Sequence, residues 1–224
     1  MVNGNFVSNF KDKSDIFNNY FAEQCQPFVN SSTLPQISNI FNGNQLTDMD
    51  ISESGISEII NKLNPKKAHG WDGISIQLLK LCPDEISIPL KLLFTKSFQT
   101  GLYPEIWKRT NVQPVHKKDS RQDIKNYRPI SLLPICGKIF EKTLFDSLYV
   151  FLTSNSLLSK NQSGFRPGDS AINQLLSITT EIYECFEDYD EVRAVFLDLS
   201  KAFDKVWHEG LIFKFKRCGI DGVF

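Results

Sequence analysis

The chain lacks the cysteine and histidine spacing of a structural zinc site. Its three histidines do not group with its cysteines, and no C-x-x-C pair occurs among the five widely separated cysteines: Cys25, Cys82, Cys136, Cys185 and Cys218. Structural zinc sites bring their ligands in short pairs, so a site of that kind is not expected. Because an odd number of scattered cysteines also makes no disulfide framework, the sequence predicts reduced thiols, as in the cytosol or nucleus.

Long apolar runs are also missing. No run approaches the roughly 20 residues that a membrane-spanning helix needs. Phe6 and Val7 lie among Asn and Ser rather than in the apolar centre of a secretory signal. We therefore expect a protein of the nucleus or cytoplasm without membrane contact, in an oligomeric state that the sequence does not indicate. At 224 residues, 41% of them hydrophobic, the chain is long enough for one large domain or a domain with an extension.

The chain as a whole has no large excess of positive or negative charge, but one segment is strongly basic. The net charge is −1, whereas residues 108–128 carry seven basic residues against Asp119 and Asp123. Residues 1–62 show the reverse, with three basic residues against seven acids. A basic stripe inside a neutral chain favours a polyanionic partner, and a solvated charged loop is the alternative.

The apolar periodicity predicts many helices and few strands. Apolar residues recur every three or four positions, as in helices, over 16–21, 56–63, 78–82, 86–98, 140–151, 172–186 and 211–218. Strands are predicted at 111–116 and 129–133, as a hairpin with a long polar loop, and at 192–199. Pro114 places the first strand at a sheet edge or bulge. This order of elements predicts an α+β fold.

The stretch VFLDLSKAFD (195–204) places an acid inside an apolar run. The run shows no alternation, so it predicts a strand covered on both faces. An unpaired carboxylate there would cost several kcal/mol, so Asp198 needs a partner. A buried Arg or Lys, or a backbone cap, would make Asp198 structural, whereas a divalent metal would make it catalytic. Asp204 is interpreted as the cap of the next helix rather than as a metal ligand.

VFLDLSKAFDKVWH resembles motif A of the reverse transcriptases of non-LTR retrotransposons, in the LINE and jockey-like branch. Other stretches resemble blocks of this family in the same order: GWDG (70–73), VQPVHKK (112–118), NYRPISLL (126–133), GKIFEK (137–142) and QSGFRPG (162–168). Trp71 and Asp72 in the first of these are predicted to be structural, as a capped loop that packs an aromatic ring.

The resemblance implies a right-hand polymerase, with fingers and a partial palm behind a mostly helical N-terminal extension. It divides the chain into a polar helical extension (1–62), a helical lead-in to the fingers (63–95) and a reverse transcriptase domain (96–224). The implied activity is that of an RNA-directed DNA polymerase, which adds dNTPs to a DNA primer on an RNA template. Two Mg²⁺ ions, with Mn²⁺ as an alternative, would clamp the attacking and leaving oxygens.

The resemblance also implies roles around the metal and the nucleotide. Asp198 would hold the first metal together with the backbone carbonyl of Leu199. Phe203 would lie beneath the incoming sugar and reject a 2′-hydroxyl, with core packing as its alternative role. Lys117 and Arg128 would bind the triphosphate, because cations and above all a guanidinium fork match phosphate oxygens. A solvated charge for Lys117 and a structural ion pair for Arg128 are the alternatives.

Three further residues are implied to lie against template and primer. Gly164 would permit a close backbone approach, Phe165 belongs to the same block, and Arg166 would reach a phosphate. A turn with an exposed arginine is the alternative.

One element of the family is missing from the sequence. These enzymes take their other catalytic carboxylates from a Tyr/Phe-Ala-Asp-Asp hairpin, and the sequence contains no Asp-Asp dipeptide. We therefore expect a fragment or a degenerate copy that does not polymerise by itself. A non-catalytic remnant that still binds RNA or DNA, and an inert relic, are the alternatives.

Overall fold

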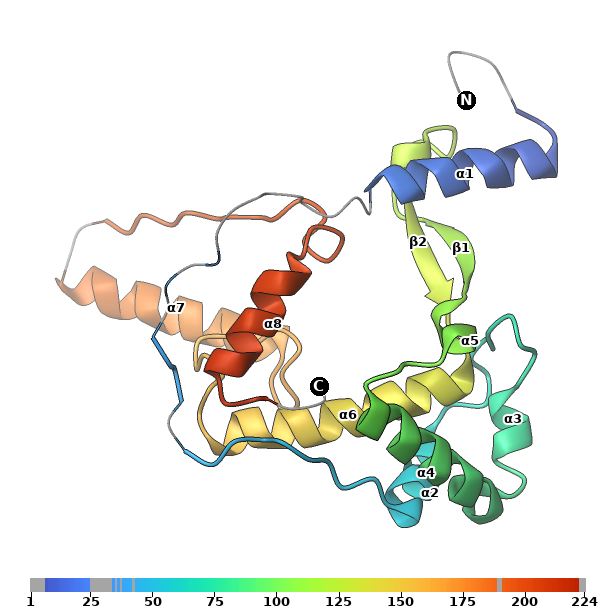
Figure 1. Ribbon diagram of the computed structural model, residues 1–224. Coiled ribbons are helices and arrows are strands. Elements are labelled where there is room, and N and C mark those ends of the chain that lie inside the picture. Colours follow the sequence, from blue (N-terminus) through green and yellow to red (C-terminus); the bar gives the residue numbers. More distant parts are fainter. Residues whose placement is uncertain are drawn as a thin grey trace. The chain divides into compact units, whose positions relative to one another are not determined.

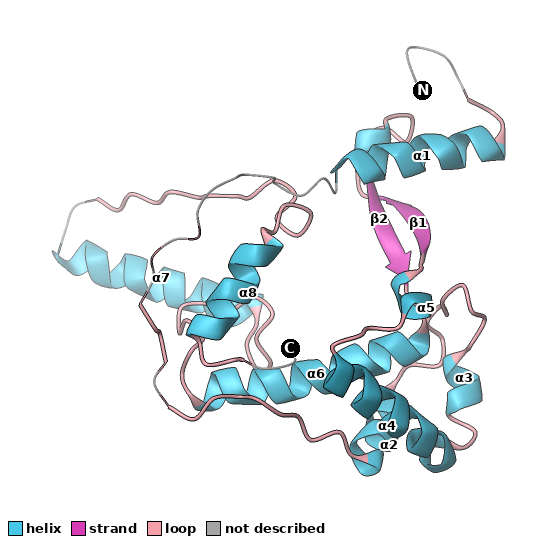
Figure 2. Ribbon diagram, viewed as in Figure 1, coloured by secondary structure: helices cyan, strands magenta, loops and turns pink. Residues whose placement is uncertain are grey.

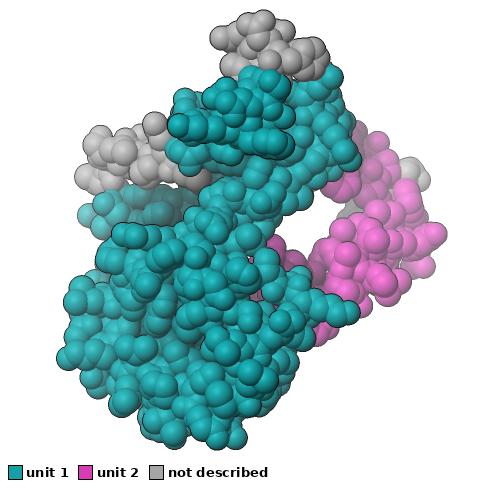
Figure 3. Space-filling view, turned by 90° about the vertical axis from the view of Figure 1, so that its right-hand side faces the viewer, with its two compact units in different colours: residues 1–151, 203–224 teal, residues 152–202 magenta. Residues whose placement is uncertain are grey.

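The computed structural model describes residues 7–24, 34, 36, 38–41, 43–188 and 191–221. The chain divides into two compact units, residues 1–151 with 203–224 and residues 152–202, which Figure 3 colours separately. Helices dominate, and the strands that the structure describes form one two-stranded sheet in the first unit (Figure 2). This mixture of helices and a small sheet is consistent with the α+β prediction. The predicted boundaries near residues 62 and 95 stay a prediction.

Most of the first unit is helical (Figure 1), and capping residues mark several of the helix ends. The Ser52 hydroxyl accepts the Gly55 amide at the start of α2, and Gly101, at φ 65°, ends α4 in the left-handed conformation. The helices between residues 53 and 154 are α2 (Glu53–Lys62), α3 (Ile76–Leu79), α4 (Pro83–Thr100), α5 (Glu105–Lys108) and α6 (Ile135–Ser154). The helix predicted at 78–82 is shorter than expected, because Pro83 starts a new helix and disfavours helical geometry at the residue before it.

The core of the first unit lies between α2, α4, α5 and α6. Phe94 on α4 is fully buried, and its ring lies 4.9 Å from that of Phe140 on α6 and 5.8 Å from that of Trp107 on α5. Ile56 and Ile60 of α2 are also fully buried. A core supplied by the predicted apolar faces explains why these helices form where the periodicity placed them.

The predicted hairpin is confirmed. β1 (Asn111–His116) pairs antiparallel with β2 (Tyr127–Leu132), and Val115 lies opposite Arg128. The basic loop between the strands contains a short 3₁₀ helix, Ile124–Asn126. Pro114 is tolerated because each strand of a two-stranded sheet is an edge strand.

The second unit contains α7 (Ala171–Asp188), which begins as predicted at Ser170, whose hydroxyl accepts the Asn173 amide at 3.2 Å. The buried strand predicted at 192–199 is wrong. Residues 191–199 form no helix or strand, and the side chains of Val195, Phe196, Leu197 and Leu199 are 80–92% exposed. A strand exists only through its ladder to a neighbour, and the described residues supply no partner for this segment.

The interpretation of Asp204 as a helix cap is also wrong. Residues 200–205 form turns, in which Lys201 has a φ of 54°, and α8 (His208–Arg217) begins only after Trp207. α8 ends as predicted before Gly219, at φ 83°.

The helix predicted from the aromatic residues near the N-terminus is observed as α1 (Phe10–Gln24). Among the described helices, none combines the length and apolarity that crossing a membrane requires.

Candidate nucleotide and metal site

The two side chains predicted to bind the triphosphate, Lys117 and Arg128, lie on one face of the hairpin. Val115 and Arg128 are cross-strand partners, and the ladder continues where the Lys117 amide donates to the Asn126 carbonyl at 2.8 Å. Side chains alternate along a strand, so residues two apart share a face, and cross-strand partners share a face as well. Lys117 and Arg128 therefore lie diagonally adjacent on the same side of the ribbon, which we call the cation face.

The cations of the hairpin are available to a ligand. The structural alternative for Arg128 was an ion pair, but the ion pairs among the described residues involve none of the exposed hairpin cations: Lys117, Lys118, Arg121, Lys125 and Arg128. Exposed and unpaired cations attract polyanions without losing an internal partner. The face is therefore suited to bind phosphate oxygens.

A loop at residues 69–74 packs against the two residues that follow β2. A Cβ on Gly70 would lie 2.6 Å from the Pro134 nitrogen and 2.8 Å from the Leu133 carbonyl carbon. Real Cβ contacts do not come that close, so only glycine fits against this backbone. The root of β2 is therefore held at a distance that no other residue type would allow.

The same loop also contacts the segment that precedes the hairpin, through α5 and Arg109. The Trp71 indole N–H donates to the Ile106 carbonyl at 3.2 Å, and the Arg109 guanidinium lies 5.9 Å from the centroid of the Trp71 ring. The Asp72 carboxylate accepts the Ile74 amide at 3.3 Å, as a turn cap. The structural roles predicted for Trp71 and Asp72 are confirmed, and the loop contacts the chain just before β1 and just after β2.

Asp72 also acts on a cysteine at the start of α6. Burial raises the pKa of the Cys136 thiol to about 11, and the negative charge of Asp72 adds to that shift. The thiol is therefore protonated at neutral pH, and thiolate chemistry or metal ligation at Cys136 is not favoured.

The first predicted metal ligand lies in the second unit. Asp198 is exposed, and its carboxylate makes no hydrogen bond or ion pair with the residues that the structure describes. Asp198 and the neighbouring Leu199 carbonyl are hard oxygen donors of the kind that Mg²⁺ takes. Within the described ranges, however, no group of three or more His, Cys, Asp or Glu is placed to hold a metal ion. These two donors fit part of a magnesium site.

The predicted template block forms a tight turn in the second unit. No atom lies within 4 Å of the Cβ position of Gly164, and Phe165 is 87% exposed at a φ of 60°. The alternative of an exposed arginine is not what the structure shows, because one guanidinium nitrogen of Arg166, Nη1, is shielded from solvent and has no hydrogen-bond partner. The open space at Gly164 is compatible with a close backbone approach by a ligand.

Phe203 lies in the turn that precedes α8 and is 79% exposed. Its alternative role, core packing, is therefore wrong. Phe203 belongs to the first unit and Asp198 to the second, so the predicted place of Phe203 beneath the sugar stays a prediction.

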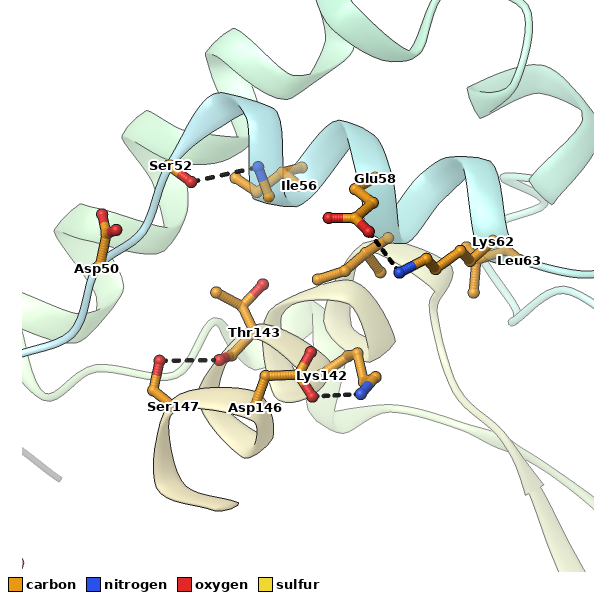
Figure 4. A pocket seen from close by; sticks show the side chains of 12 residues that line it. Asp50, Ser52, Ile56, Glu58, Lys62, Leu63, Lys142, Thr143, Asp146 and Ser147 are labelled. Atoms are coloured by element: carbon orange, nitrogen blue, oxygen red, sulfur yellow. Dashed lines mark hydrogen bonds and ion pairs between the residues drawn. The ribbon is translucent and has the colours of Figure 1, made fainter. Parts of the chain in front are cut away.

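A hollow between α2 and α6 is lined by none of the predicted site residues (Figure 4). It has a volume of about 580 Å³, and ion pairs border it on both helices, Glu58 with Lys62 on α2 and Lys142 with Asp146 on α6. Asp50 also lines it, so three carboxylates face two lysines and the hollow does not favour a phosphate.

Sequence reasoning missed two features around the hairpin. The close approach of Gly70 to Pro134 has a weak signal, a glycine directly before a large aromatic residue. The second is the aromatic contact between Phe17 of α1 and Tyr127 of β2, with ring centroids 4.9 Å apart. The spacing of the aromatic residues predicted that helix but not the surface on which it packs.

Comparison with known proteins finds a match over the second half of the chain. The sequence profile of the family described as reverse transcriptase (RNA-dependent DNA polymerase) matches residues 115–223. This range includes Lys117, Arg128 and Asp198.

Similar curated proteins come from mobile elements of Drosophila melanogaster. The probable RNA-directed DNA polymerase from transposon BS is 34% identical over 163 residues, which cover 72% of this chain and 18% of that protein. The RNA-directed DNA polymerase from mobile element jockey is 30% identical over 212 residues, 92% of this chain and 23% of that protein. The probable RNA-directed DNA polymerase from transposon X-element is 29% identical over 222 residues, 96% of this chain and 24% of that protein. The chain therefore spans 18–24% of the length of these relatives.

Proposed function

We propose that this chain, whose residues 115–223 match the reverse transcriptase family, supplies the nucleotide-binding hairpin and the first metal ligand of an RNA-directed DNA polymerase. In this proposal an RNA template directs the addition of dNTPs to a DNA primer. Lys117 and Arg128 bind the triphosphate of the incoming dNTP. Gly164, Phe165 and Arg166 lie against template and primer.

The cation face carries this proposal. Lys117 and Arg128 come from different strands, share one face of the ribbon and have no ion pair among the described residues. Phosphoryl transfer depends mainly on positioning and on neutralising the charge of the phosphates. Two cations held in place before binding can both position a triphosphate and neutralise its charge.

Reverse transcriptases generally use divalent metal ions, and we propose Mg²⁺ at Asp198 with the Leu199 carbonyl. When bound, such an ion would stabilise the charge that develops on the reacting phosphate. Further carboxylates would complete its coordination, as the absence of an Asp-Asp dipeptide from the sequence implies. Phe203 would reject the 2′-hydroxyl of a ribonucleotide.

Titration with Mg²⁺–dTTP tests the cation face. Arg128→Ala and Lys117→Ala should each weaken binding by about tenfold or more, because a hydrogen bond to a charged group contributes about 1.5–3 kcal/mol. Lys96→Ala, which removes an exposed lysine from α4, is the matched control and should leave the affinity unchanged. Equal affinities for all four proteins would contradict the proposal.

Primer extension tests the catalytic part. With Mg²⁺ and all four dNTPs, we expect no product from residues 1–224 alone, since one carboxylate does not hold two metal ions. Extension that is lost on Asp198→Ala would overturn this expectation.

A second candidate function is nucleic-acid binding without chemistry. The exposed, unpaired cations of the hairpin favour it. Binding to a single-stranded RNA should weaken with salt, and Arg128→Ala should lower the slope of log K against log salt concentration by about 0.7, the value for one phosphate contact. Weak binding with a flat salt dependence would contradict both this candidate and template binding.

A further inference from the structure

The helix α1 carries its aromatic residues on one face. Phe10, Phe17 and Phe21 are spaced by seven and four positions, which places them along one side of a helix. Phe10 is 85% exposed, whereas Phe21 is 7% exposed, and the rings of Phe17 and Phe21 lie 5.6 Å apart. The second half of this stripe is therefore covered, and the first half is not.

The covered half of the stripe meets the hairpin. The Phe17 ring packs edge-on against Tyr127, with centroids 4.9 Å apart and an interplanar angle of 66°. Figure 1 shows α1 against the end of the hairpin that carries the basic loop. A hollow of about 660 Å³ beside this contact is lined by residues of α1 and β1, among them Phe21 and Val112.

Tyr127 is itself fixed on several sides. Its ring packs edge-on against His116, with centroids 5.3 Å apart, and its hydroxyl donates to the Arg121 carbonyl at 2.9 Å. His116 and Tyr127 are cross-strand partners, directly before Lys117 and directly before Arg128 in the sequence. The contact with Phe17 thus completes a cluster that joins α1, both strands and the basic loop.

Alternation along the strands places this cluster behind the cation face. His116 and Tyr127 point to one side of the ribbon, while Lys117 and Arg128 point to the other. α1 therefore contacts the hairpin without covering the two cations. A helix that packed on the opposite side would block them.

We propose that α1 is a rear support for the hairpin and that Phe17 is a positioning residue for triphosphate binding, acting through Tyr127 on Lys117 and Arg128. This inference rests on the proposed function of the cation face. An isolated two-stranded ribbon is marginally stable in water. With α1 in place, both cations are held in position before the nucleotide arrives.

The size of the effect follows from the fraction of molecules with a binding-competent hairpin. The apparent dissociation constant equals the intrinsic constant divided by that fraction. If the hairpin without Phe17 is competent in a third to a fifth of the molecules, Phe17→Ala weakens triphosphate binding about threefold to fivefold.

The test titrates inorganic triphosphate with Mg²⁺ into the chain and into three variants of α1. Phe17→Ala should weaken binding about threefold to fivefold, and Phe17→Tyr, which keeps the ring, should restore the affinity. Phe10→Ala, which removes an exposed ring from the same helix, should change nothing. A 3-fluorotyrosine at Tyr127 reports the contact directly, and its ¹⁹F resonance should shift in Phe17→Ala because the neighbouring ring is lost.

The outcomes separate this inference from the proposed function. Binding that Arg128→Ala weakens, but that Phe17→Ala leaves unchanged while the ¹⁹F resonance shifts, would overturn the support role alone. An unmoved ¹⁹F resonance would overturn it too, because Phe17 would then not contact Tyr127. No triphosphate binding by the unaltered chain would overturn the proposed function and the inference together.

Discussion

In the proposed function the hairpin binds the triphosphate and the segment around Asp198 binds the metal ion. The two regions differ in the contacts that stabilise their backbone. β1 and β2 pair with each other along their whole length, with the loop at residues 69–74 at their root and α1 behind their far end. Residues 195–199 are more apolar than either strand but have no ladder, and their apolar side chains are 80–92% exposed. The comparison teaches that an apolar run becomes a strand only where the chain also supplies its neighbour.

The largest expected contrast lies between two phenylalanines, one from the core and one from the exposed segment. Phe94→Ala should lower the free energy of unfolding by about 3–5 kcal/mol, because it leaves a cavity between Trp107 and Phe140. Phe196→Ala should change it by less than about 0.5 kcal/mol, since the side chain is 90% exposed. Urea unfolding measures both, and a large loss in Phe196→Ala would show that the segment is packed in solution.

Two glycines give the next contrast. Gly70→Ala should lower the free energy of unfolding by about 3 kcal/mol, because the new Cβ would overlap backbone atoms that cannot move aside without shifting β2. Gly164→Ala should have little effect on stability, since nothing lies within 4 Å of its Cβ position. Equal stabilities of the two variants would show that the loop does not hold the hairpin root.

Whether the sequence predicts a helix or strand correctly depends on how far along the chain its packing or pairing partner lies. β1 was predicted with its observed bounds because its partner follows within the same hairpin, and α4 was predicted because its apolar face and Gly101 are local signals. The strand at 192–199 was predicted from apolarity alone, and its partner is not among its sequence neighbours. The same limit applied to α1, whose aromatic face was visible in the sequence although its contact with Tyr127 was not.

The site divides in the same way. The shared face of Lys117 and Arg128 follows from register, which a hairpin fixes locally. The cap role of Asp204 was wrong because the turn through Lys201 delays the start of α8 to His208, and no local signal marked that turn.

A smaller effect is expected where the loop at residues 69–74 contacts α5, just before the hairpin. Trp71→Phe keeps an aromatic ring beside Arg109 but removes the donor to the Ile106 carbonyl. The loss of one such hydrogen bond should lower the free energy of unfolding by about 1 kcal/mol. Thermal unfolding of the variant beside the unaltered chain measures it, and an unchanged midpoint would show that this hydrogen bond does not contribute.

The smallest effect concerns acid stability in the second unit. Hydrogen bonds, chiefly from Ser163 and also from the Ser170 amide, lower the pKa of the Asp169 carboxyl. A lowered folded-state pKa contributes stability above the unfolded-state pKa, and this is lost as the pH falls through the folded-state pKa. The helix signal of the chain in circular dichroism should therefore fall less steeply below about pH 4 in Asp169→Asn than in the unaltered chain. Superimposable pH profiles would contradict this assignment.

Amide hydrogen exchange of the intact chain tests the central difference most directly, because one experiment reads both regions. The account predicts slow exchange for the ladder amides of β1 and β2 and exchange at the rate of an unstructured peptide for residues 192–199. Protection of residues 195–199 comparable with that of the hairpin would contradict it, since the segment around Asp198 would then already be a paired strand.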